Sequence, residues 1–527
     1  RLDRYAAARD TLDWALQPHP FRRFIGSPRV LLARRFAREP VAFDRIYDGA
    51  GLPLQPLTLD VLADFLRHSL ALSAWKQWRT SRWSLRVNPS SGNLHPTEAT
   101  LVLPALPGLG EAGVFHYTAD EHALQRRATV SEATWRAVLP GVEGGAFLVG
   151  LTSVVWREAW KYGERAFRYC QHDAGHALAA LRFAANLQGW KLAVLPRWPD
   201  DSAAALLGVD RSADFVAEER DVPEMLLAVG PAARVDALAA AAAPDEAALA
   251  RWRTAAWHGT AAPLSRDHHD WPVLGEIVAA TDAPARAPGT PCNRSWPPLP
   301  ARANLPDARR ILLQRRSAVD FDGTTRIPRD ALFAMLDRTL PRAFAPFDAW
   351  PWPAEVDLLL FVHRVDGLPP GAYVLARTAD GAQRLRAGTR AEFAWSPVEG
   401  APAHLPLFFL AGGDTRPVAR LACCHQEIAA DGCFALAMLA RFAPALAERG
   451  ASFYRALFQE TGMIGQVLYL EAEVHGVRGT GIGCFFDDVV HEVLGRQGDG
   501  VQALYCFTVG GPVEDARLTT EPGYPEG

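Results

Sequence analysis

Two long stretches decide the fold, because each repeats the pattern of the other. Residues 166–190 read AFRYCQHDAGHALAALRFAANLQGW, and residues 453–477 read FYRALFQETGMIGQVLYLEAEVHGV. Both carry apolar residues at helical spacing and end near a glycine, so we expect one long helix in each. Glycines coincide at one constant offset, in the pairs Gly175 and Gly462, Gly189 and Gly476, and Gly208 and Gly495. Such a register is typical of an internal repeat.

The repeat extends beyond these stretches. HPTEATLVLPALPGLGEAGVFHY at residues 95–117 matches WPAEVDLLLFVHRVDGLPPGAYVL at residues 352–375, with Glu98 falling on Glu355. Both stretches read as β-hairpins. Each half then closes with a strand that ends in Val-Gly-Pro or Val-Gly-Gly-Pro. The sequence therefore predicts one α+β unit that occurs twice.

The length of the chain also favours two domains. It has 527 residues, more than one hydrophobic core usually serves, since cores stop growing near roughly 250 to 300 residues. We predict domains at residues 1–231 and 303–527, joined by an Ala- and Pro-rich linker at residues 232–302. Within the linker we expect only a short helix near Asp245, because no other apolar period is sustained there.

The composition is that of an ordinary globular protein, with 49% hydrophobic residues, 10% aromatic residues and a formal net charge of −4. Without a basic excess, no nucleic-acid partner is expected. No apolar run approaches the ~20 residues that span a bilayer, and no leader opens the chain, so we expect a cytoplasmic protein without a membrane partner. Because the chain begins at Arg1, we expect a short N-terminal piece to precede it.

Cysteines and histidines do not form a recognisable metal or disulfide pattern. The seven cysteines are odd in number and irregular in spacing, which predicts no disulfide framework and agrees with a reducing compartment. They are Cys170, Cys292, Cys423, Cys424, Cys433, Cys484 and Cys506. His172, Asp173 and His176 have a spacing compatible with a metal, but no third-ligand motif accompanies them, so we interpret them as hydrogen-bonding helix residues. Cys423, Cys424, His425 and Cys433 lack paired C-x-x-C spacing and are interpreted as buried thiols. No metal site is predicted.

Two segments carry a resemblance to a known family. ILLQRRSAVDF at residues 311–321 and NPSSGNLHPTE at residues 88–98 resemble the hallmark segments of the nitroreductase superfamily. The branch they resemble is that of the SagB-type dehydrogenases, which includes the azoline oxidases of thiazole- and oxazole-forming peptide pathways. The likeness covers most of both halves, and YGERAFRYCQHDAGH from Tyr162 strengthens it.

The resemblance implies an FMN site. In the family, an Arg-Arg-Ser segment at the start of a helix binds the phosphate and ribityl chain, and a Pro-Ser-Ser-x-Asn loop touches the isoalloxazine ring. A guanidinium fork at a helix N-terminus suits a phosphate, and a turn of small residues brings backbone N–H groups close to a ring edge. The matching residues are Arg315, Arg316 and Ser317, and Pro89, Ser90, Ser91, Gly92 and Asn93.

Each half carries only one of these two segments. Opposite Pro89 to Asn93, the second half reads PFDAW at residues 346–350, and the first half reads DRIYDGA near Asp44 where an Arg-Arg-Ser would be expected. Family members are dimers in which each FMN lies between subunits and receives one segment from each. The resemblance therefore implies an intramolecular pseudodimer with one complete site and one FMN per chain.

Two further segments belong to this site by resemblance. GTGIGCFFDD at residues 479–488 resembles the glycine-rich segment at the flavin N5 edge, which assigns Gly481, Ile482, Gly483 and Cys484 to the cofactor. Arg517 resembles a C-terminal basic residue near the phosphate. Phe485 and Phe486 depart from the family pattern of small residues, so the shape of the pocket at N5 is left open. We interpret Cys484 as a flavin contact rather than a redox thiol.

A lysine and a tyrosine are the candidate catalytic groups. Azoline oxidases use a Lys-Tyr pair to manage the substrate proton, and Lys161 and Tyr162 resemble that pair. A lysine near an aromatic wall and a flavin can act as a general base. Lysine is rare in this chain, which otherwise uses arginine, and this favours a specific role. The alternative is a solvated lysine at a helix surface.

Together these features predict an FMN-dependent oxidoreductase that transfers hydride at flavin N5, with NAD(P)H or dioxygen as electron partner. One version oxidises an azoline in a small molecule or modified peptide. An alternative reduces a nitro, quinone or enone acceptor. A second alternative is a non-catalytic scaffold that holds flavin or a peptide. The fold permits all three. Association beyond the internal pair is left open.

Overall fold

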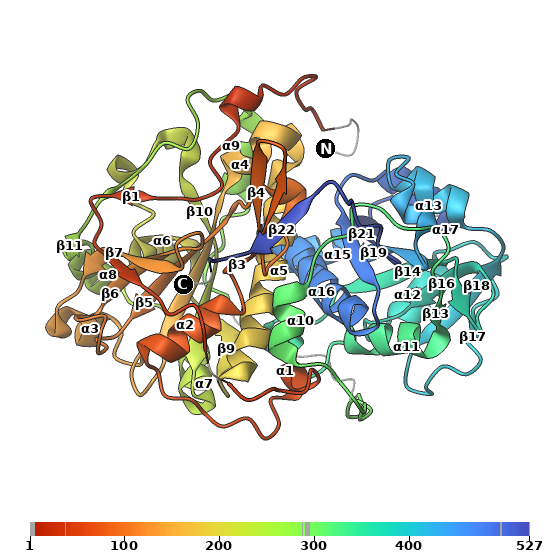
Figure 1. Ribbon diagram of the computed structural model, residues 1–527, viewed down its shortest axis with the longest axis horizontal. Helices are drawn as coiled ribbons and strands as arrows, with labels where there is room; N and C mark the ends of the chain where they lie inside the picture. Colours follow the sequence, from red (N-terminus) through yellow and green to blue (C-terminus); the bar gives the residue numbers. More distant parts are fainter. Residues whose placement is uncertain (1–5, 37, 287, 290–295, 496–497, 526–527) are drawn as a thin grey trace.

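The computed structural model of the protein consists of two halves that lie side by side, each built on an antiparallel sheet (Figure 1). It describes residues 6–36, 38–286, 288–289, 296–495 and 498–525. Within these ranges no helix is both long and apolar enough to cross a membrane.

The two main sheets have the same strand order. The first contains β2 (Arg29–Leu31), β5 (Thr97–Leu103), β6 (Gly113–Thr118), β7 (Ala123–Thr129), β8 (Phe147–Val154), β9 (Lys191–Val194), β10 (Asp221–Gly230) and β11 (Ala256–Trp257). The second contains β14 (Val356–Val362), β16 (Gly371–Leu375), β17 (Ser396–Pro397), β18 (Leu407–Gly412), β19 (Phe434–Arg441), β20 (Arg478–Ile482) and β21 (Val501–Gly510). The shared path is β7-β6-β5-β8-β10-β9 in the first and β18-β16-β14-β19-β21-β20 in the second. Pairing of β5 with β6 and of β14 with β16 confirms both predicted hairpins.

The helices follow the repeat as well. Those before residue 300 are α1 (Arg45–Asp48), α2 (Leu59–Arg67), α3 (Glu132–Val138), α4 (Val155–Tyr162), α5 (Ala166–Leu187), α6 (Asp200–Leu207), α7 (Ala232–Ala240), α8 (Glu246–Arg253) and α9 (Pro272–Ala280). Those after it are α10 (Ala308–Gln314), α11 (Arg329–Arg338), α12 (Gly381–Ala387), α13 (Arg416–Ala422), α14 (Ile428–Asp431), α15 (Phe442–Arg449), α16 (Phe453–Val474) and α17 (Asp487–Leu494). Single 3-10 turns lie at Trp14–Leu16, Ser91–Asn93, Gly163–Arg165, Ser212–Asp214, Ala217–Glu219 and Phe347–Ala349.

Helices cover both faces of each sheet. On the outer face of the first sheet, α3, α6, α7 and α8 bury Trp135, Leu206, Leu238 and Trp252 against strand residues such as Leu148. On the outer face of the second sheet, α12, α13, α14 and α17 likewise bury apolar side chains against the strands. The inner faces of both sheets share one continuous core with α2, α5, α11 and α16. The two halves are therefore joined by burial of apolar surface, which is the main stabilising term.

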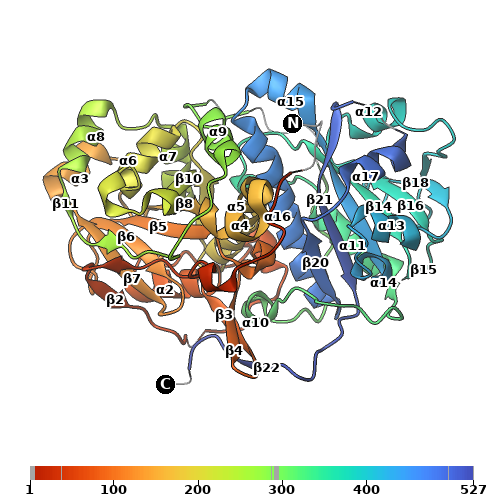
Figure 2. The ribbon, with the colours of Figure 1, turned by 90° about the horizontal axis from the view of Figure 1, so that it is seen from above.

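The helices predicted at residues 166–190 and 453–477 are α5 and α16. They lie against each other between the two sheets (Figure 2). Gly175 and Gly462 meet at the crossing. A Cβ on Gly175 would overlap the backbone carbonyl of Gln459, and one on Gly462 would lie 2.9 Å from the Gly175 Cα. Because any side chain would hold the helices apart, the matched glycines set the distance between the halves.

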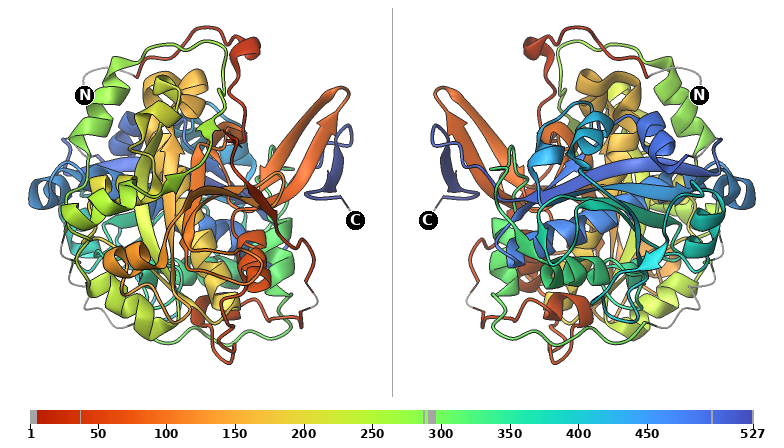
Figure 3. Two further views of the ribbon diagram at one scale, coloured as in Figure 1. Left: turned by 90° about the vertical axis from the view of Figure 1, so that its left-hand side faces the viewer. Right: turned by 90° about the vertical axis from the view of Figure 1, so that its right-hand side faces the viewer.

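Polar contacts and one strand pairing between the halves add to this helix crossing. Gln459 Nε2 donates to Gln171 Oε1 at 2.8 Å, and Arg182 donates to both Asp348 oxygens at 2.8 and 2.9 Å. The C-terminal β22 (Thr519–Pro522) returns to the first half and pairs with β3 (Leu72–Trp78), which also pairs with β4 (Ser81–Arg86). This small sheet stands out from the body of the molecule (Figure 3).

The segment predicted as an irregular linker is more ordered than expected. The helix expected near Asp245 is α8, capped by the Asp245 side chain. The expectation of no other regular structure is wrong, because α7, α9, β11 and β12 (Thr260–Ala261) also form there. Two of these strands extend the first half: β11 pairs with β7, and β12 with β1 (Phe24–Ile25). The physical reason is burial, since Val235, Leu249 and Trp252 pack into the outer core despite the alanine-rich sequence around them.

The remaining short strands are β13 (Ile327–Pro328) and β15 (Val365–Asp366), which pair with each other. The six described cysteines are free thiols, while Cys292 lies outside the described residues.

Gly175→Ala is expected to lower the free energy of unfolding by about 3 kcal/mol, because the new methyl group meets backbone that cannot move aside. Gly275, an exposed helix residue with open space around it, is the matched control. Gly275→Ala should leave stability unchanged or raise it by up to about 1 kcal/mol. Urea unfolding of both variants measures the difference. Equal stability of the two would show that the crossing does not hold the halves together.

Candidate functional site

A cavity of about 600 Å³ lies between the two halves. Its wall includes twelve of the predicted cofactor residues: Pro89, Ser90, Ser91, Gly92, Asn93, Arg315, Arg316, Ser317, Gly481, Ile482, Gly483 and Cys484. Segments far apart in the sequence therefore meet at one place. Cavities of roughly 300 to 1,000 Å³ are typical of small-molecule and cofactor sites.

The loop at residues 89–93 forms one wall through a tight turn. Gly92 has φ +57, and a Cβ there would lie 2.9 Å from a ring carbon of Tyr162. Glycine is therefore required by both the backbone conformation and the close approach of the tyrosine. The Asn93 amide donates to the Ser84 carbonyl at 3.0 Å, and the Ser90 hydroxyl accepts from the His95 backbone N–H at 2.8 Å. The side chains of the loop thus hold its own shape.

Asp173 on α5 holds this loop in place through hydrogen bonds. Its carboxylate accepts from the Ser91 backbone N–H and from the Ser91 hydroxyl, both at 2.9 Å. Asp173 is buried and lines the cavity, and burial raises its pKa to about 7 despite these hydrogen bonds. A carboxyl group in this state exchanges a proton near neutral pH.

Arg315 joins the two halves at the other end of the cavity. Its Nε and Nη2 donate to the backbone carbonyls of Val87 and Arg86, each at 3.0 Å. Its guanidinium also lies 5.0 Å from the ring centre of Tyr469. The Nη1 atom is buried and has no hydrogen-bond partner within the part of the chain that the structure describes. A donor held in this way is available to a ligand in the cavity.

Arg315 and Arg316 together form a cationic end of the cavity. The Arg316 side chain donates to the carbonyls of Leu313, Arg315 and Ser73 at 2.7 to 3.1 Å. Both guanidinium groups are thus bound to neutral carbonyls rather than to carboxylates. Burial, and then the Arg315 charge, lower the pKa of Arg316 to about 10, so it stays charged at neutral pH. A bound anion would offset both effects.

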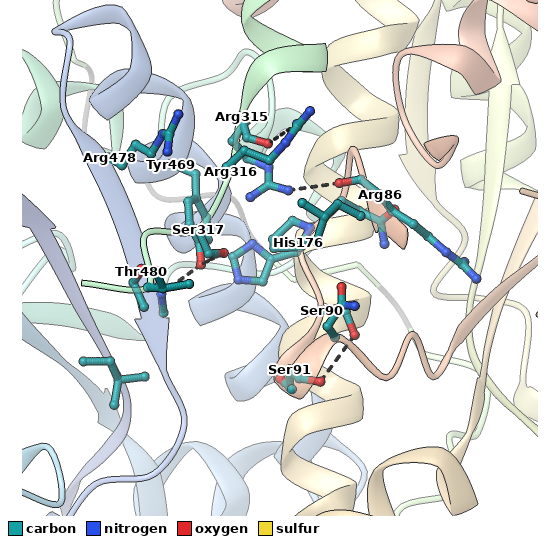
Figure 4. A pocket seen from close by; sticks show the side chains of 18 of the residues that line it. Arg86, Ser90, Ser91, His176, Arg315, Arg316, Ser317, Tyr469, Arg478 and Thr480 are labelled. Carbon is teal, nitrogen blue, oxygen red and sulfur yellow. Dashed lines mark hydrogen bonds between the residues drawn. The ribbon is translucent and has the colours of Figure 1, made fainter. Parts of the chain in front are cut away.

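Figure 4 shows these arginines grouped with Arg478 on one side of the cavity and Ser90 and Ser91 on the other. Arg478 is partly neutralised, because it pairs with Glu473 at 3.6 Å and with Glu514. Arg315 and Arg316 therefore contribute more positive charge to this end than Arg478 does. An anionic group such as a phosphate suits this end.

The Arg-Arg-Ser segment does not begin a helix, which corrects one expectation. It follows α10, and Arg315 is the C-cap. The helix instead begins at Ala308, after the N-cap residue Asp307, whose side chain accepts a hydrogen bond from the Arg310 backbone N–H. Because a helix C-terminus carries a partial negative charge, this helix does not assist anion binding. The positive charge of this segment is supplied by its guanidinium groups without help from a helix terminus.

The glycine-rich segment forms the wall contributed by β20. The Gly481 backbone N–H donates to the Tyr469 hydroxyl at 2.9 Å, and that hydroxyl also lies 2.9 Å from the Ser317 hydroxyl. Tyr469 thereby ties Ser317 to the glycine-rich segment. No functional motif of the sequence contains this tyrosine.

The candidate catalytic pair is divided by the structure. Tyr162 lines the cavity, and its ring lies 4.6 Å from that of Tyr169. Burial raises the pKa of Tyr162 above its usual value, so the phenol stays protonated at neutral pH. Lys161 is not part of the described cavity wall, and its ammonium lies 5.1 Å from the Tyr162 ring centre. Any effect of Lys161 on the cavity would pass through Tyr162.

Arg517 is also not part of the described wall. Its side chain is 74% exposed and pairs with Asp515 at 2.8 Å. Its partner Asp515 does line the cavity, so Arg517 lies beside the wall and its contact with a phosphate stays a prediction. Among the arginines, Arg478 also lines the cavity. Its position directly before the glycine-rich segment was the available sequence signal.

The three polar residues with metal-like spacing on α5 make different contacts. His172 bonds to the Thr461 hydroxyl at 2.9 Å, Asp173 binds Ser91, and His176 lies 3.3 Å from the Tyr505 hydroxyl. Among the described residues, no group of three or more His, Cys, Asp or Glu side chains is arranged to hold a metal ion.

A much smaller pocket, about 50 Å³, lies where the repeat would place a second site. Its lining includes Ala456, Leu195 and Pro196, the repeat partners of Tyr169, Ile482 and Gly483, which line the large cavity. Trp350 and Trp352, opposite Asn93 and His95 in the repeat, line it as well. Residues from the linker line it too, and the Arg286 backbone N–H donates to the Pro196 carbonyl at 2.7 Å. The second pocket is too small for a nucleotide cofactor.

Comparisons with known proteins agree with this architecture. The model named "Nitroreductase family" matches residues 312–511, so the second half contains a nitroreductase family domain. A solved structure from Anabaena variabilis, named as a nitroreductase, is 22% identical and covers 96% of each chain with a TM-score of 0.69, which shows the fold of the whole chain. No curated protein matched.

Two other solved structures match part of the chain. One, from Ralstonia eutropha and also named as a nitroreductase, is 13% identical over 44% of this chain and 98% of that chain, with a TM-score of 0.29. The other is the E. coli microcin synthetase McbBCD complex with truncated pro-MccB17 bound, 19% identical over 37% of this chain and 70% of that chain, with a TM-score of 0.25.

Asp173→Asn is expected to change how stability depends on pH. Since the folded pKa of about 7 lies above the ordinary value of 3.8, the folded state binds more protons between these values, and wild-type stability falls as pH rises. The variant lacks this contribution. Its stability relative to wild type should therefore improve between pH 5 and pH 8, as urea unfolding at several pH values would show. A difference in the free energy of unfolding that stays constant with pH would contradict the raised pKa of Asp173. Other titrating groups do not affect this difference, because wild type and variant both contain them.

Proposed function

We propose that this protein is an FMN-dependent oxidoreductase whose one cofactor site is built from both halves of the chain. The observation that carries the proposal is the cavity of about 600 Å³, with arginines of the second half at one end and the serine loop of the first half at the other. The nitroreductase family domain at residues 312–511 supports a flavin as the ligand.

The residues present suit FMN. Arg315 and Arg316 offer two guanidinium charges without carboxylate partners to the phosphate, and the buried, unpaired Nη1 of Arg315 is the specific donor. The backbone and side chains of Ser90 to Asn93 and of Gly481 to Cys484 would hold the ring. When bound, FMN would supply a two-electron acceptor and donor of hydride.

One FMN per chain is part of the proposal. The two sheets share a strand order, and the matched helices cross at matched glycines, as expected for an intramolecular pseudodimer. A symmetric pair would have two equal sites, yet the second pocket measures about 50 Å³ and contains Trp350 and Trp352. The halves have therefore specialised: the first supplies the loop and the second the cationic end.

Tyr162 is the group we assign to proton handling at the substrate. It lines the cavity, and because burial keeps it protonated it can donate a hydrogen bond to a substrate heteroatom. Lys161 acts as a positioning residue through its contact with the Tyr162 ring. This is a modified form of the Lys-Tyr pair that the resemblance to SagB-type dehydrogenases implies.

The compound that reduces the flavin would identify the substrate class. We propose an azoline-type ring in a small molecule or modified peptide, with dioxygen as the final electron acceptor. Rapid reduction of the holoprotein by NAD(P)H alone would instead assign a nitro, quinone or enone reductase. A flavin that neither class of donor reduces would assign a scaffold. Anaerobic stopped-flow absorbance with each donor distinguishes these outcomes.

Arg315→Ala is expected to weaken FMN binding roughly 10- to 100-fold, because the phosphate loses a charge-assisted hydrogen bond. Ser91→Ala should weaken it less, by up to about tenfold, through loss of the contact that orders the loop. Quenching of flavin fluorescence on titration gives both affinities. Arg420→Ala, which removes an exposed arginine paired with Glu427, is the control. Equal affinities for Arg315→Ala and Arg420→Ala would remove Arg315 from the site.

Tyr162→Phe is expected to lower the rate of hydride transfer by about 100-fold while FMN stays bound, because general acid–base groups contribute at about this level. Lys161→Ala should have a smaller effect, since Lys161 is not among the residues that line the cavity. Single-turnover rates at matched flavin content measure both. A larger loss for Lys161→Ala than for Tyr162→Phe would reverse the two roles.

A further inference from the structure

Two thiols face each other at the wall of the cavity. The Sγ atoms of Cys424 and Cys484 lie 2.8 Å apart. They are the two partly exposed members of the six described cysteines, since Cys170, Cys423, Cys433 and Cys506 are buried. Cys484 also lines the cavity, so a small reactant in the cavity reaches its sulfur first.

Hydrogen bonds on both sides hold the two thiols in place. The Gln426 side chain donates to the Cys484 carbonyl at 3.2 Å, and the Phe486 backbone N–H donates to the Ala422 carbonyl at 2.7 Å. Cys424 itself has φ +53, a conformation that non-glycine residues seldom adopt. The turn after α13 is thus fixed against the glycine-rich segment with both sulfurs already adjacent.

The surroundings give the two thiols different roles. Arg165 donates from Nη1 to the Cys484 Sγ at 3.4 Å, which places a positive charge beside the sulfur that reaches the cavity. Burial raises the pKa of Cys424 to about 12, so Cys424 stays a thiol at neutral pH. Cys484 is therefore placed to react first and Cys424 to react second.

The neighbouring cysteine does not compete for this role. Cys423 is buried and hydrogen-bonds to Cys506 on β21. Both lie in the outer core of the second half, so the vicinal cysteines face different partners.

We propose that Cys424 and Cys484 form a peroxide-reactive dithiol that closes into a reversible disulfide. The Cys484 thiolate attacks one oxygen of hydrogen peroxide; the O–O bond breaks, and the departing hydroxide takes a proton and leaves as water. The resulting sulfenic acid on Cys484 is attacked by the Cys424 sulfur. The S–O bond breaks, the Cys424 proton joins the hydroxide, and a second water leaves. Two thiols are oxidised and one peroxide is reduced, without any part for FMN.

The test uses the reduced full-length protein, exposed to one equivalent of hydrogen peroxide, alkylated and digested for mass spectrometry. We expect a Cys424–Cys484 crosslink that dithiothreitol reverses, formed roughly ten times faster than oxidation of the buried Cys433. Cys423→Ser is the matched control and should keep the crosslink, which matters because Cys423 and Cys424 share one tryptic peptide. Cys424→Ser should lose the crosslink and instead accumulate a sulfenic acid on Cys484 that dimedone labels.

Other outcomes overturn the proposal. A crosslink that persists in Cys424→Ser but is lost in Cys423→Ser would show that Cys484 pairs with Cys423 and not with Cys424. Oxidation of Cys484 no faster than that of Cys433 would show that Cys484 is not specially reactive. Arg165→Gln should slow dimedone labelling of Cys484 in the Cys424→Ser background, and an unchanged rate removes Arg165 from the mechanism. Circular dichroism of each variant separates these results from unfolding. Because no step needs flavin, failure here leaves the proposed oxidoreductase function untouched.

Discussion

The close crossing of α5 and α16 is the constraint on which the rest of the structure depends. Gly175 and Gly462 let two helix backbones touch, and this contact brings the inner faces of both sheets into one core. The same contact fixes where the segments after α10 and after β4 meet. Arg315 reaches the carbonyls of Arg86 and Val87 only because the halves approach this closely. The cavity is thus a consequence of helix packing.

Much of this could be predicted from the sequence, since glycines in register and matched hairpins are strong local signals. Of the helices in the linker, α8 was predicted, but α7 and α9 could not be, because alanine-rich segments show little contrast between a buried and an exposed face. The Arg-Arg-Ser segment was placed at the wrong end of a helix; Asp307, a favourable N-cap residue, was the overlooked signal. Arg517 was assigned by resemblance alone; it is exposed and pairs with Asp515 at the edge of the cavity, so its role stays a prediction.

Two residues that the sequence did not assign to the cofactor site complete it. Asp173 and Tyr469 lie on the two long helices, where their neighbours are core residues, and each reaches a loop that is distant in the sequence. Their partners follow from the tertiary structure alone. The thiol pair is another such case: Cys424 and Cys484 are separated by 60 positions, and their sequence neighbourhoods gave no reason to expect reactivity. In both cases the repeat predicted the scaffold but not the side chains that meet on it.

The central claim is that one composite cavity holds one FMN while its counterpart is closed. The most direct measurement is the amount of flavin released per chain from protein saturated with FMN and freed of excess, determined by absorbance against an independent protein concentration. The account predicts a ratio of one, because about 600 Å³ is open at one position and about 50 Å³ at the other. A ratio near two would show that the second pocket opens, and a ratio near zero would contradict the flavin site itself.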